Sequence, residues 1–204
     1  MVNLTAPFSD ASVKNRQPIV EKLKRLLKKS IKVLEIGSGT GQHAVWFAPR
    51  LHWLTWVPSD LPQQILGIEC WLNDFPSKNL APPLALDVSE HWPRIKHDAI
   101  FSANTAHIMH PLQVKKMITK GARSLPHRGL FCLYGPFIFK NILLAESNVE
   151  FDKKLQDLDP YMGLREFAEL NKLAAASSMQ ILEINPMPAN NHLIVWQKTG
   201  NCPI

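Results

Sequence analysis

The feature that most constrains this chain is an apolar run that leads directly into three closely spaced glycines. The run Val33-Leu34-Glu35-Ile36 precedes Gly37-Ser38-Gly39-Thr40-Gly41, and a helical pattern follows over 41–51. Glycine permits a tight turn and lets the backbone approach a ligand closely, and the first N–H groups of the following helix are free to bind it. We therefore predict a buried strand over 31–36 and a ligand-binding turn over 37–41.

Apolar runs and helical patterns alternate along the rest of the chain. The expected strands cover 53–57, 84–86, 98–103, 129–134, 180–184 and 193–197, and the expected helices cover 62–74, 111–124 and 164–177. Such alternation is typical of β-α-β units and a largely parallel sheet. We therefore predict an α/β fold of the Rossmann-like class I methyltransferase type. Its seven-stranded sheet is expected to be mostly parallel, with an antiparallel last strand and helices on both faces.

Two segments stand outside this alternation. Residues 135–160 form a long stretch with aromatic side chains and a predicted short helix, and loops of this length usually act as lids or binding loops. Residues 185–191 are rich in turn formers and are expected to join the last two strands. Because the 204 residues contain no repeat or long linker, we expect one domain over 1–204. Within it, 1–30 form an N-terminal segment and helix, and 135–160 form the lid.

The composition argues against a membrane protein and a disulfide-linked one. Hydrophobic residues make up 46 % and charged residues 20 % of the chain, and no apolar run approaches the ~20 residues that a membrane span needs. The first ten residues lack the basic start and apolar stretch of a signal peptide, so we expect a cytoplasmic protein. Cys70, Cys132 and Cys202 lie far apart, which favours neither disulfides nor a zinc site.

Part of the net charge of +6 is concentrated in one segment. Its basic residues are Lys22, Lys24, Arg25, Lys28 and Lys29, and apolar residues stand between them at helical spacing. This pattern predicts an amphipathic helix with a basic outer face. A solvated face is the simpler interpretation, and an RNA-binding or phosphate-binding patch is the alternative.

The spacing of the glycines distinguishes between nucleotide cofactors. A dinucleotide-binding turn has the pattern Gly-x-Gly-x-x-Gly, whereas here the third glycine comes one residue early and Gln42 stands at the dinucleotide position. This spacing favours S-adenosylmethionine, which carries no pyrophosphate, over NAD. The turn residues Gly37, Ser38, Gly39 and Gly41 are the expected cofactor contacts.

Acidic residues near the ends of the expected strands fit the same cofactor. Asp60 can accept hydrogen bonds from both ribose hydroxyls, and Asp87 can accept one from the adenine amino group. Either residue could instead be a loop or capping residue. Glu35 could hold the cofactor's ammonium group, because a buried carboxylate is costly unless it is paired. Asn15 and Arg16 either begin the first helix or belong to a segment that closes over the cofactor.

Several longer stretches carry a more specific signal than the glycine turn. They are Asn15-Arg16-Gln17-Pro18-Ile19, Leu34-Glu35-Ile36-Gly37-Ser38-Gly39-Thr40-Gly41-Gln42-His43-Ala44, Pro58-Ser59-Asp60, Leu86-Asp87-Val88, Leu133-Tyr134-Gly135-Pro136-Phe137, Ser147-Asn148-x-x-Phe151-Asp152 and Met187-Pro188-Ala189-Asn190-Asn191. In these stretches, over nearly its whole length, the chain resembles the uncharacterised methyltransferase-like family of bacteria and animals that includes human methyltransferase-like protein 26. The resemblance implies a class I methyltransferase fold and S-adenosylmethionine binding, and it implies no particular substrate.

The chain departs from the pattern of that family at two places. The family loop after the fourth strand usually reads Asn-x-x-His-Ile-x-Pro-Trp, whereas this chain has Asn104-Thr105-Ala106-His107-Ile108-Met109-His110-Pro111-Leu112. His110 therefore interrupts the pattern, and the tryptophan is missing. Because of this departure, the acceptor pocket could differ in shape from that of the family. Gly37 replaces an alanine, a change that only loosens the turn.

Three residues are the candidates for the chemistry. Methyl transfer from a sulfonium depends on in-line placement, and a base helps only where the acceptor must lose a proton. His107 is the expected base because histidine titrates near neutrality, although it could simply pack a loop. Asn104 and Tyr134 are expected beside the sulfonium methyl, with Asn104 also contacting the cofactor. His107 and His110 could share a metal, but no further ligand is evident, so we expect none.

The acceptor is expected to be lined by residues from the fifth strand, the lid and the closing turn. These are Tyr134, Asn148, Phe151, Asp152, Arg165, Asn190 and Asn191. Each has a structural alternative: Tyr134 could be a packing residue, Asp152 could pair with Arg165, and the two asparagines of the turn could supply positive φ angles.

The sequence therefore predicts an S-adenosylmethionine-dependent methyltransferase that acts on a small-molecule acceptor. We expect its pocket at the carboxyl ends of the first, fourth and fifth strands, where ligands of open α/β sheets bind. An RNA methyltransferase, supported by the basic helix, is one alternative, and a cofactor-binding protein without catalysis that works through partners is another. No oligomeric state follows from the sequence.

Overall fold

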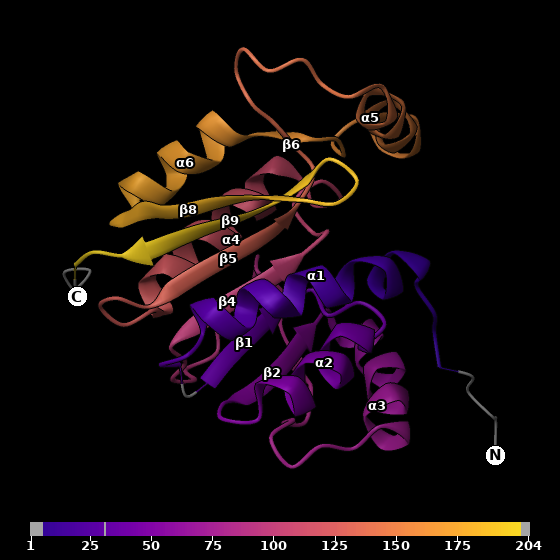
Figure 1. Ribbon diagram of the computed structural model, residues 1–204, viewed down its shortest axis with the longest axis vertical. Coiled ribbons are helices and arrows are strands. Elements are labelled where there is room, and N and C mark those ends of the chain that lie inside the picture. Colours follow the sequence, from indigo (N-terminus) through magenta and orange to yellow (C-terminus); the bar gives the residue numbers. More distant parts are fainter. Residues whose placement is uncertain (1–5, 31, 201–204) are drawn as a thin grey trace. The chain divides into compact units, whose positions relative to one another are not determined.

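A computed structural model describes residues 6–30 and 32–200, and its ribbon is drawn in Figure 1. Seven hydrogen-bonded strands follow one another in the order β3-β2-β1-β4-β5-β9-β8, and β6 and β7 form a separate pair. The chain divides into two compact units, Met1–Phe101 and Ser102–Ile204, which are described in turn. Residues 1–5, Ile31 of the predicted first strand and Cys202 lie outside the described residues.

The first unit consists of parallel strands and the helices that follow them. Its elements are α1 (Asp10–Leu26), β1 (Lys32–Ile36), α2 (Gln42–Phe47), η1 (Ala48–Leu51), β2 (Thr55–Asp60), η2 (Pro62–Gln64), α3 (Ile65–Asp74), β3 (Leu84–Ala85) and the first residues of β4 (Ala99–Ala103). β1 runs parallel to β2 from Lys32↔Thr55 to Ile36↔Ser59, and β2 runs parallel to β3. This register ends β1 and β2 at the same edge of the sheet, where the glycine turn and Asp60 follow.

Helix α1 has the amphipathic character that its sequence predicts. The side chain of Ser9 caps its start by accepting a hydrogen bond from Ser12 N at 3.3 Å. Its apolar residues Ile19, Val20 and Leu23 are fully buried. Burial of this stripe removes apolar surface from water, which is the main reason a helix of this kind is stable in a folded chain.

An aromatic cluster forms the core beneath the glycine turn. Phe47 of α2 packs edge-on against Trp56 of β2 at 5.3 Å and against Phe101 of β4 at 5.6 Å between ring centroids. All three rings are fully buried. Edge-to-face packing at these distances suits the quadrupoles of aromatic rings, so this cluster holds α2 firmly against β2.

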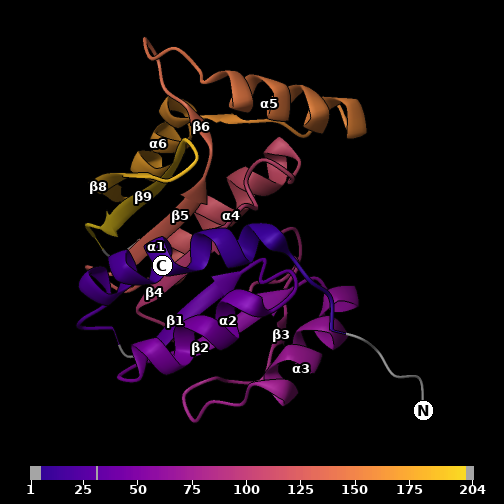
Figure 2. The same ribbon diagram turned by 45° about the vertical axis from the view of Figure 1, so that its right-hand side comes forward.

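The second unit carries the antiparallel end of the sheet. Its elements are the end of β4, α4 (Pro111–Ser124), β5 (Leu130–Gly135), β6 (Phe137–Ile138), α5 (Glu146–Leu158), β7 (Arg165–Glu166), α6 (Phe167–Ala176), β8 (Met179–Met187) and β9 (Asn191–Lys198). β9 is antiparallel to both β5 and β8, as predicted for the last strand. In Figure 2, α5 stands apart from the strands β5, β8 and β9 of its own unit.

The structure confirms the predicted α/β fold with its seven-stranded, mostly parallel sheet, and it corrects several local predictions. The helix in the 135–160 segment is longer than expected, since α5 has 13 residues. β8 continues to Met187 and β9 begins at Asn191, so only residues 188–190 of the turn predicted over 185–191 lie outside the strands. The parallel pair β6–β7 was not predicted, because its two strands have two residues each and lie far apart in the sequence. Among the described residues, no helix has both the length and the apolar character that a membrane span requires.

Candidate functional site

The glycine turn of the first unit adopts a conformation that favours glycine at three positions. Gly37, Gly39 and Gly41 have φ angles of +71°, +57° and +89°. A Cβ atom at Gly41 would lie 3.1 Å from Ile68 Cα, so the missing side chain lets α2 approach α3 closely. Around Gly39, in contrast, a Cβ atom would meet nothing within 4 Å. The turn is therefore packed behind Gly41 and open at Gly39.

Asp60, the predicted ribose-binding carboxylate, lies directly beside the open part of the turn. Its Oδ2 accepts a hydrogen bond from Gly39 N at 2.6 Å, and its Oδ1 accepts one from Leu61 N at 2.7 Å. Burial raises the pKa of Asp60 above its usual value, and the hydrogen bonds from these two backbone donors offset only part of that rise. Because two carboxylate oxygens can accept about four hydrogen bonds, Asp60 keeps acceptor capacity for two further donors such as ribose hydroxyls.

Asp87 makes a local turn after β3. Its Oδ1 accepts a hydrogen bond from Ser89 N at 2.7 Å, the geometry of an aspartate that stabilises its own loop. This is the loop role that the sequence left open for Asp87. The contact occupies one of its acceptor positions, and a contact to an adenine amino group stays a prediction.

Glu35 is buried in β1 and is tied to residues of β2. Its Oε2 accepts hydrogen bonds from Ser38 Oγ at 2.8 Å and from Trp56 Nε1 at 2.9 Å. Ser38 Oγ in turn accepts one from Ser59 N at 3.1 Å. Burial raises the pKa of Glu35 to about 7, and the nearby charge of Asp60 adds to that rise. The partners Trp56 and Ser59 were not predicted from the sequence: Trp56 lies within the strand expected over 53–57, and Ser59 lies beyond it, in the part of β2 that the prediction left out.

Asn15 and Arg16 of α1 both contact α2, the helix that follows the glycine turn. Asn15 Oδ1 lies 2.7 Å from His43 Nε2, and the His43 ring stacks on Phe47 at 5.0 Å between centroids. Burial lowers the pKa of His43 to about 4, and the charge of Arg16 adds to that effect. His43 is therefore neutral at pH 7 and can donate from Nε2 to Asn15. The Arg16 guanidinium lies over the Trp46 ring, 3.7 Å from its centroid.

The segment before α1 is tied beside the glycine turn by contacts that sequence reasoning missed. Gln42 Oε1 accepts hydrogen bonds from Ser9 N at 2.6 Å and from Thr40 Oγ1 at 3.0 Å. Trp71 Nε1 donates to Pro7 O at 2.6 Å. Gln42 Nε2 is buried and has no hydrogen-bond partner within the part of the chain that the structure describes. Gln42 therefore presents a free amide donor next to the turn, and its place in the glycine pattern was the signal that could have found it.

His107 is the centre of the candidate site in the second unit. It follows Asn104, which has a φ of +57° and donates its backbone N–H to Tyr134 O at 2.9 Å. The His107 ring is buried and meets the Phe151 ring edge-on at 5.2 Å between centroids. Burial and, to a smaller extent, the charge of Arg165 lower the pKa of His107 to about 4. The imidazole is therefore neutral at pH 7, but it is a weaker base than the sequence led us to expect from a histidine that titrates near neutrality.

Arg165 holds the loop that carries His107. Its Nε donates to Ala106 O at 3.0 Å, and its NH2 group donates to Met109 O at 2.6 Å and to Tyr161 O at 2.7 Å. Gly163 N also donates to His107 O at 2.9 Å. These bonds fasten the chain between α5 and β7 to the loop after β4. Arg165 thus donates hydrogen bonds to backbone carbonyl oxygens, whereas the sequence analysis expected it to contact the substrate.

Asp152 does not form an ion pair with Arg165, the structural alternative that the sequence left open for these two residues. Its Oδ1 accepts a hydrogen bond from Leu164 N at 2.6 Å, and its Oδ2 accepts one from Gln156 Nε2 at 3.0 Å. The negative charge of Asp152 raises the pKa of Arg165, but burial lowers it by more, so the pKa of Arg165 lies below its usual value. Asp152 thus supports the same segment as Arg165 through separate contacts.

The closing turn between β8 and β9 is tied to the start of α5. Asn148 Nδ2 donates to Asn190 O at 3.3 Å, and Asn190 Nδ2 donates to Ser147 Oγ at 3.3 Å. Ala189 and Asn190 both have φ of +56°, so Asn191 was wrongly offered as one of the two residues with positive φ. Asn191 instead begins β9.

His110, which the sequence analysis marked as a departure from the expected family pattern, caps α4. Its Nδ1 accepts a hydrogen bond from Leu112 N at 3.1 Å, and Gln113 Oε1 accepts one from His110 N at 3.0 Å. This reciprocal arrangement satisfies two backbone donors at the start of the helix. Within residues 6–30 and 32–200, no group of three or more His, Cys, Asp or Glu side chains could hold a metal ion.

Comparison with known proteins gives a family and a set of similar folds. Residues 6–198 match a family described as "Protein of unknown function (DUF938)". An O-methyltransferase family protein from Burkholderia thailandensis is 12 % identical, with a TM-score of 0.81 over 95 % of this chain and 59 % of its own.

Two further structures share the fold. An O-methyltransferase family 2 protein from Planctomyces limnophilus, in complex with apigenin, is 16 % identical, with a TM-score of 0.77 over 93 % of this chain and 58 % of its own. PigF with SAH is 16 % identical, with a TM-score of 0.76 over 89 % of this chain and 55 % of its own. This chain therefore spans little more than half the length of these proteins, and at such identities the likeness establishes the fold.

Proposed function

The chain belongs to the DUF938 family, and for this member we propose S-adenosylmethionine-dependent methylation of a small-molecule acceptor. The observation that carries the proposal is the open glycine turn with Asp60 beside it, where Gly39 N and Asp60 Oδ2 lie 2.6 Å apart. The fold similarity to PigF, described with SAH, supports the cofactor, and the similarity to an O-methyltransferase family 2 protein in complex with apigenin supports the acceptor class.

Residues of the first unit fit the cofactor by their chemistry. Asp60 has acceptor capacity left for ribose hydroxyls, and the free space at Gly39 would let a ligand approach the backbone. Gln42 adds a buried amide donor that lacks a protein partner among the described residues. Glu35 would face the cofactor's ammonium group from beneath the turn, and Asp87 would accept from the adenine. When bound, S-adenosylmethionine supplies a methyl group that its sulfonium already activates.

Residues of the second unit provide the groups that an acceptor needs. His107 is neutral at pH 7, so a ring nitrogen can accept the proton that an acceptor hydroxyl loses, although the lowering of its pKa to about 4, chiefly by burial, makes it a weaker base than an exposed histidine. Asn104 and Tyr134 would orient the acceptor through polar atoms. Phe151, which packs on the His107 ring, would present an apolar face to the acceptor's carbon skeleton.

Calorimetry tests the cofactor assignment directly. We expect S-adenosylmethionine and S-adenosylhomocysteine to bind with micromolar affinity and NAD not to bind. Asp60→Ala should weaken that binding by ~1.5–3 kcal/mol, the value of hydrogen bonds to a charged group. The control carries Lys24→Glu in α1 and Lys28→Glu just after its end, which should leave cofactor binding unchanged. Binding of NAD as tight as that of S-adenosylmethionine would contradict the proposal.

A screen with labelled cofactor against a metabolite extract, and against RNA, tests the acceptor class. Transfer of label to small molecules is the expected result. Transfer to RNA that the Lys24→Glu and Lys28→Glu control abolishes would replace the small-molecule acceptor with RNA. Tight cofactor binding without transfer to any acceptor would instead indicate a cofactor-binding protein that works through partners.

A further inference from the structure

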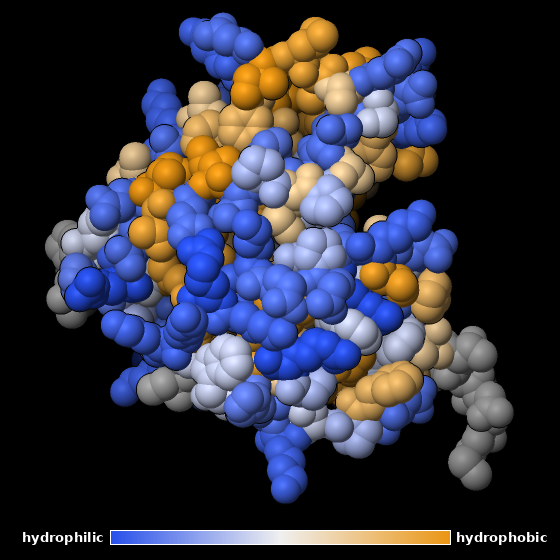
Figure 3. Space-filling view, viewed as in Figure 1, coloured by the Kyte–Doolittle hydropathy of each residue, from blue (hydrophilic) through white to orange (hydrophobic). Residues whose placement is uncertain are grey.

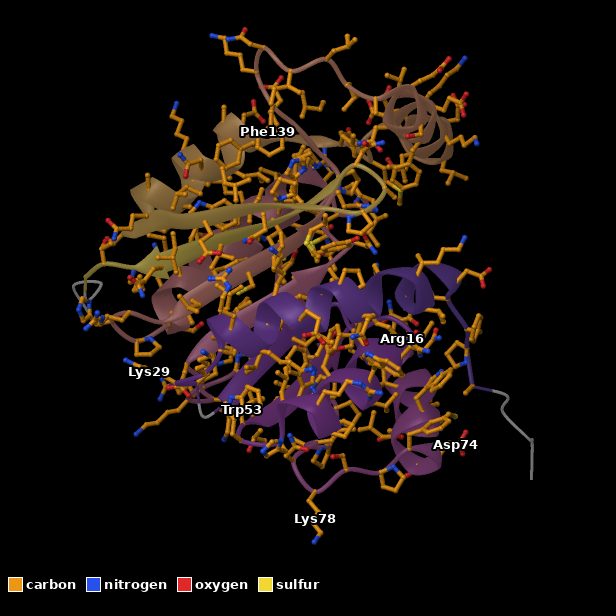
Figure 4. All side chains as sticks on the ribbon, viewed as in Figure 1. Arg16, Lys29, Trp53, Asp74, Lys78 and Phe139 are labelled. Carbon is orange, nitrogen blue, oxygen red and sulfur yellow. The ribbon has the colours of Figure 1, made fainter. Side chains whose placement is uncertain are left out.

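Two arginines of the first unit stack on opposite faces of one tryptophan. The Arg16 guanidinium from α1 lies 3.7 Å from the centroid of the Trp46 ring, and the Arg50 guanidinium from η1 lies 3.4 Å from it. Trp46 comes one helical turn after Gln42, the first residue of α2. The stack therefore lies close to the glycine turn along α2. Arg16 is labelled in Figure 4, and Figure 3 shows hydrophilic side chains gathered over α1 and α2 on the face drawn.

The two guanidinium groups have donors to spare. Arg50 NH1 donates to Trp46 O at 3.1 Å, and in the described part of the chain no ion pair joins either arginine to a carboxylate. Stacking occupies the flat face of a guanidinium and leaves its N–H edges free for in-plane hydrogen bonds. Two positive charges on either side of one ring also repel each other, since a thin indole screens them poorly. Both arginines therefore lack the anion that would normally balance them.

Two further observations point to a missing anion at the same place. Trp46 Nε1 is buried and has no hydrogen-bond partner among the residues that the structure describes. Buried donors are nearly always satisfied, so an unpaired indole N–H beside two arginines calls for an acceptor. The pKa of the neighbouring His43 is also lowered to about 4, first by burial and second by the positive charge of Arg16.

We propose that Arg16, Trp46 and Arg50 form a site for an oxyanion, a phosphate or carboxylate group carried by a ligand. Arginine presents its donors in a planar fork that matches both kinds of oxyanion, and two forks held by one ring form a preorganised pair. An anion at this site would also relieve the repulsion between the two guanidinium groups. This site does not depend on the methyl-transfer proposal, because oxyanion binding requires neither cofactor nor turnover.

The site is tested by following the indole N–H signal of Trp46 in a 15N NMR titration with inorganic phosphate. The ionic strength is kept constant with chloride, and the signal is assigned from its loss in Trp46→Phe. We expect a saturating shift of the Trp46 signal with a millimolar dissociation constant. Arg16→Gln and Arg50→Gln should each weaken phosphate binding at least about tenfold, the effect of removing a charged hydrogen-bond donor. Lys28→Gln, at an exposed position just after α1, is the matched control and should change it less than about twofold.

Two results would overturn the proposal. One is a Trp46 signal that does not move with phosphate while the remaining indole signals show an intact fold. The other is an equal loss of binding in Lys28→Gln, which would mean that phosphate responds only to general positive charge. Repeating the titration with S-adenosylhomocysteine at saturation identifies the source of the oxyanion. If that compound shifts the Trp46 signal and blocks phosphate, the group is its carboxylate; if phosphate still binds, the group belongs to a second ligand.

Discussion

Replacing Glu35 with glutamine should remove a pH dependence of stability that one buried carboxyl group creates. Glu35 is fully buried, and its burial raises its pKa from the usual 4.5 to about 7. Below pH 4.5 the group is protonated in both the folded and the unfolded chain and has no effect on the pH profile. Between pH 4.5 and pH 7 the unfolded chain loses this proton while the folded chain keeps it. Stability that is present at low pH is therefore lost as the pH rises through this window.

The size of the effect follows from the shift. Each pKa unit corresponds to about 1.36 kcal/mol, so the rise from 4.5 to about 7 corresponds to a loss of about 3 kcal/mol between pH 4.5 and pH 8. Glutamine has nearly the same shape and carries no titrating proton. Its carbonyl oxygen can still accept from Trp56 Nε1 and Ser38 Oγ, as Glu35 Oε2 does at 2.9 Å and 2.8 Å. Glu35→Gln should therefore match the wild type near pH 4.5 and exceed its stability by about 3 kcal/mol at pH 8.

Urea unfolding of both proteins at half-unit steps from pH 4.5 to pH 8 measures this difference. The wild-type free energy of unfolding should fall relative to that of Glu35→Gln, with most of the fall between pH 5 and pH 7. Parallel profiles for the two proteins would refute the reasoning, because they would mean that Glu35 titrates alike in the folded and unfolded chain. Adding S-adenosylhomocysteine should flatten the wild-type profile if Glu35 meets the cofactor's ammonium group, since a cation there favours the ionised carboxylate.

Two further substitutions test the turn and the loop of the second unit. Gly41→Ala should destabilise the protein by about 3 kcal/mol in urea unfolding, because it adds a close contact with Ile68 Cα at 3.1 Å to the strain of a positive φ. Gly39→Ala, where a Cβ atom meets open space, should cost about 1–2 kcal/mol and chiefly weaken cofactor binding; equal costs at both positions would contradict this account of the turn. Arg165→Gln should raise the pKa of His107 above about 4 in an NMR titration of its ring, because a positive charge nearby is lost. Arg165→Lys keeps that charge and should leave the pKa of His107 closer to the wild-type value. An unchanged pKa in Arg165→Gln would show that burial alone lowers the pKa of His107.

The sequence by itself determined the main architecture, because its signals are local. An apolar strand, three glycines and a helix must follow one another as β1, the turn and α2, whatever the remainder of the chain does. Helix α4 begins at Pro111 and ends at Ser124 as predicted, since proline suits a first helical position and the apolar spacing of the following residues is regular. Asp60 ends the second strand as predicted, and it lies beside the glycine turn because two parallel neighbouring strands end at one edge of the sheet.

Only the tertiary structure decided which polar groups meet. Glu35 pairs with Trp56 because the register of β1 and β2 brings their side chains together, and register depends on the pairing of whole strands. Arg165 reaches the carbonyls of Ala106 and Met109 across more than fifty residues of chain, so no local pattern encodes that contact. The stacking of Arg16 on Trp46 arises in the same way, from helices that pack on one another only in the folded chain, whereas Arg50 stands only four residues after Trp46. Hydrogen bonds and stacking need positions fixed to within a few tenths of an ångström, and only packing fixes them.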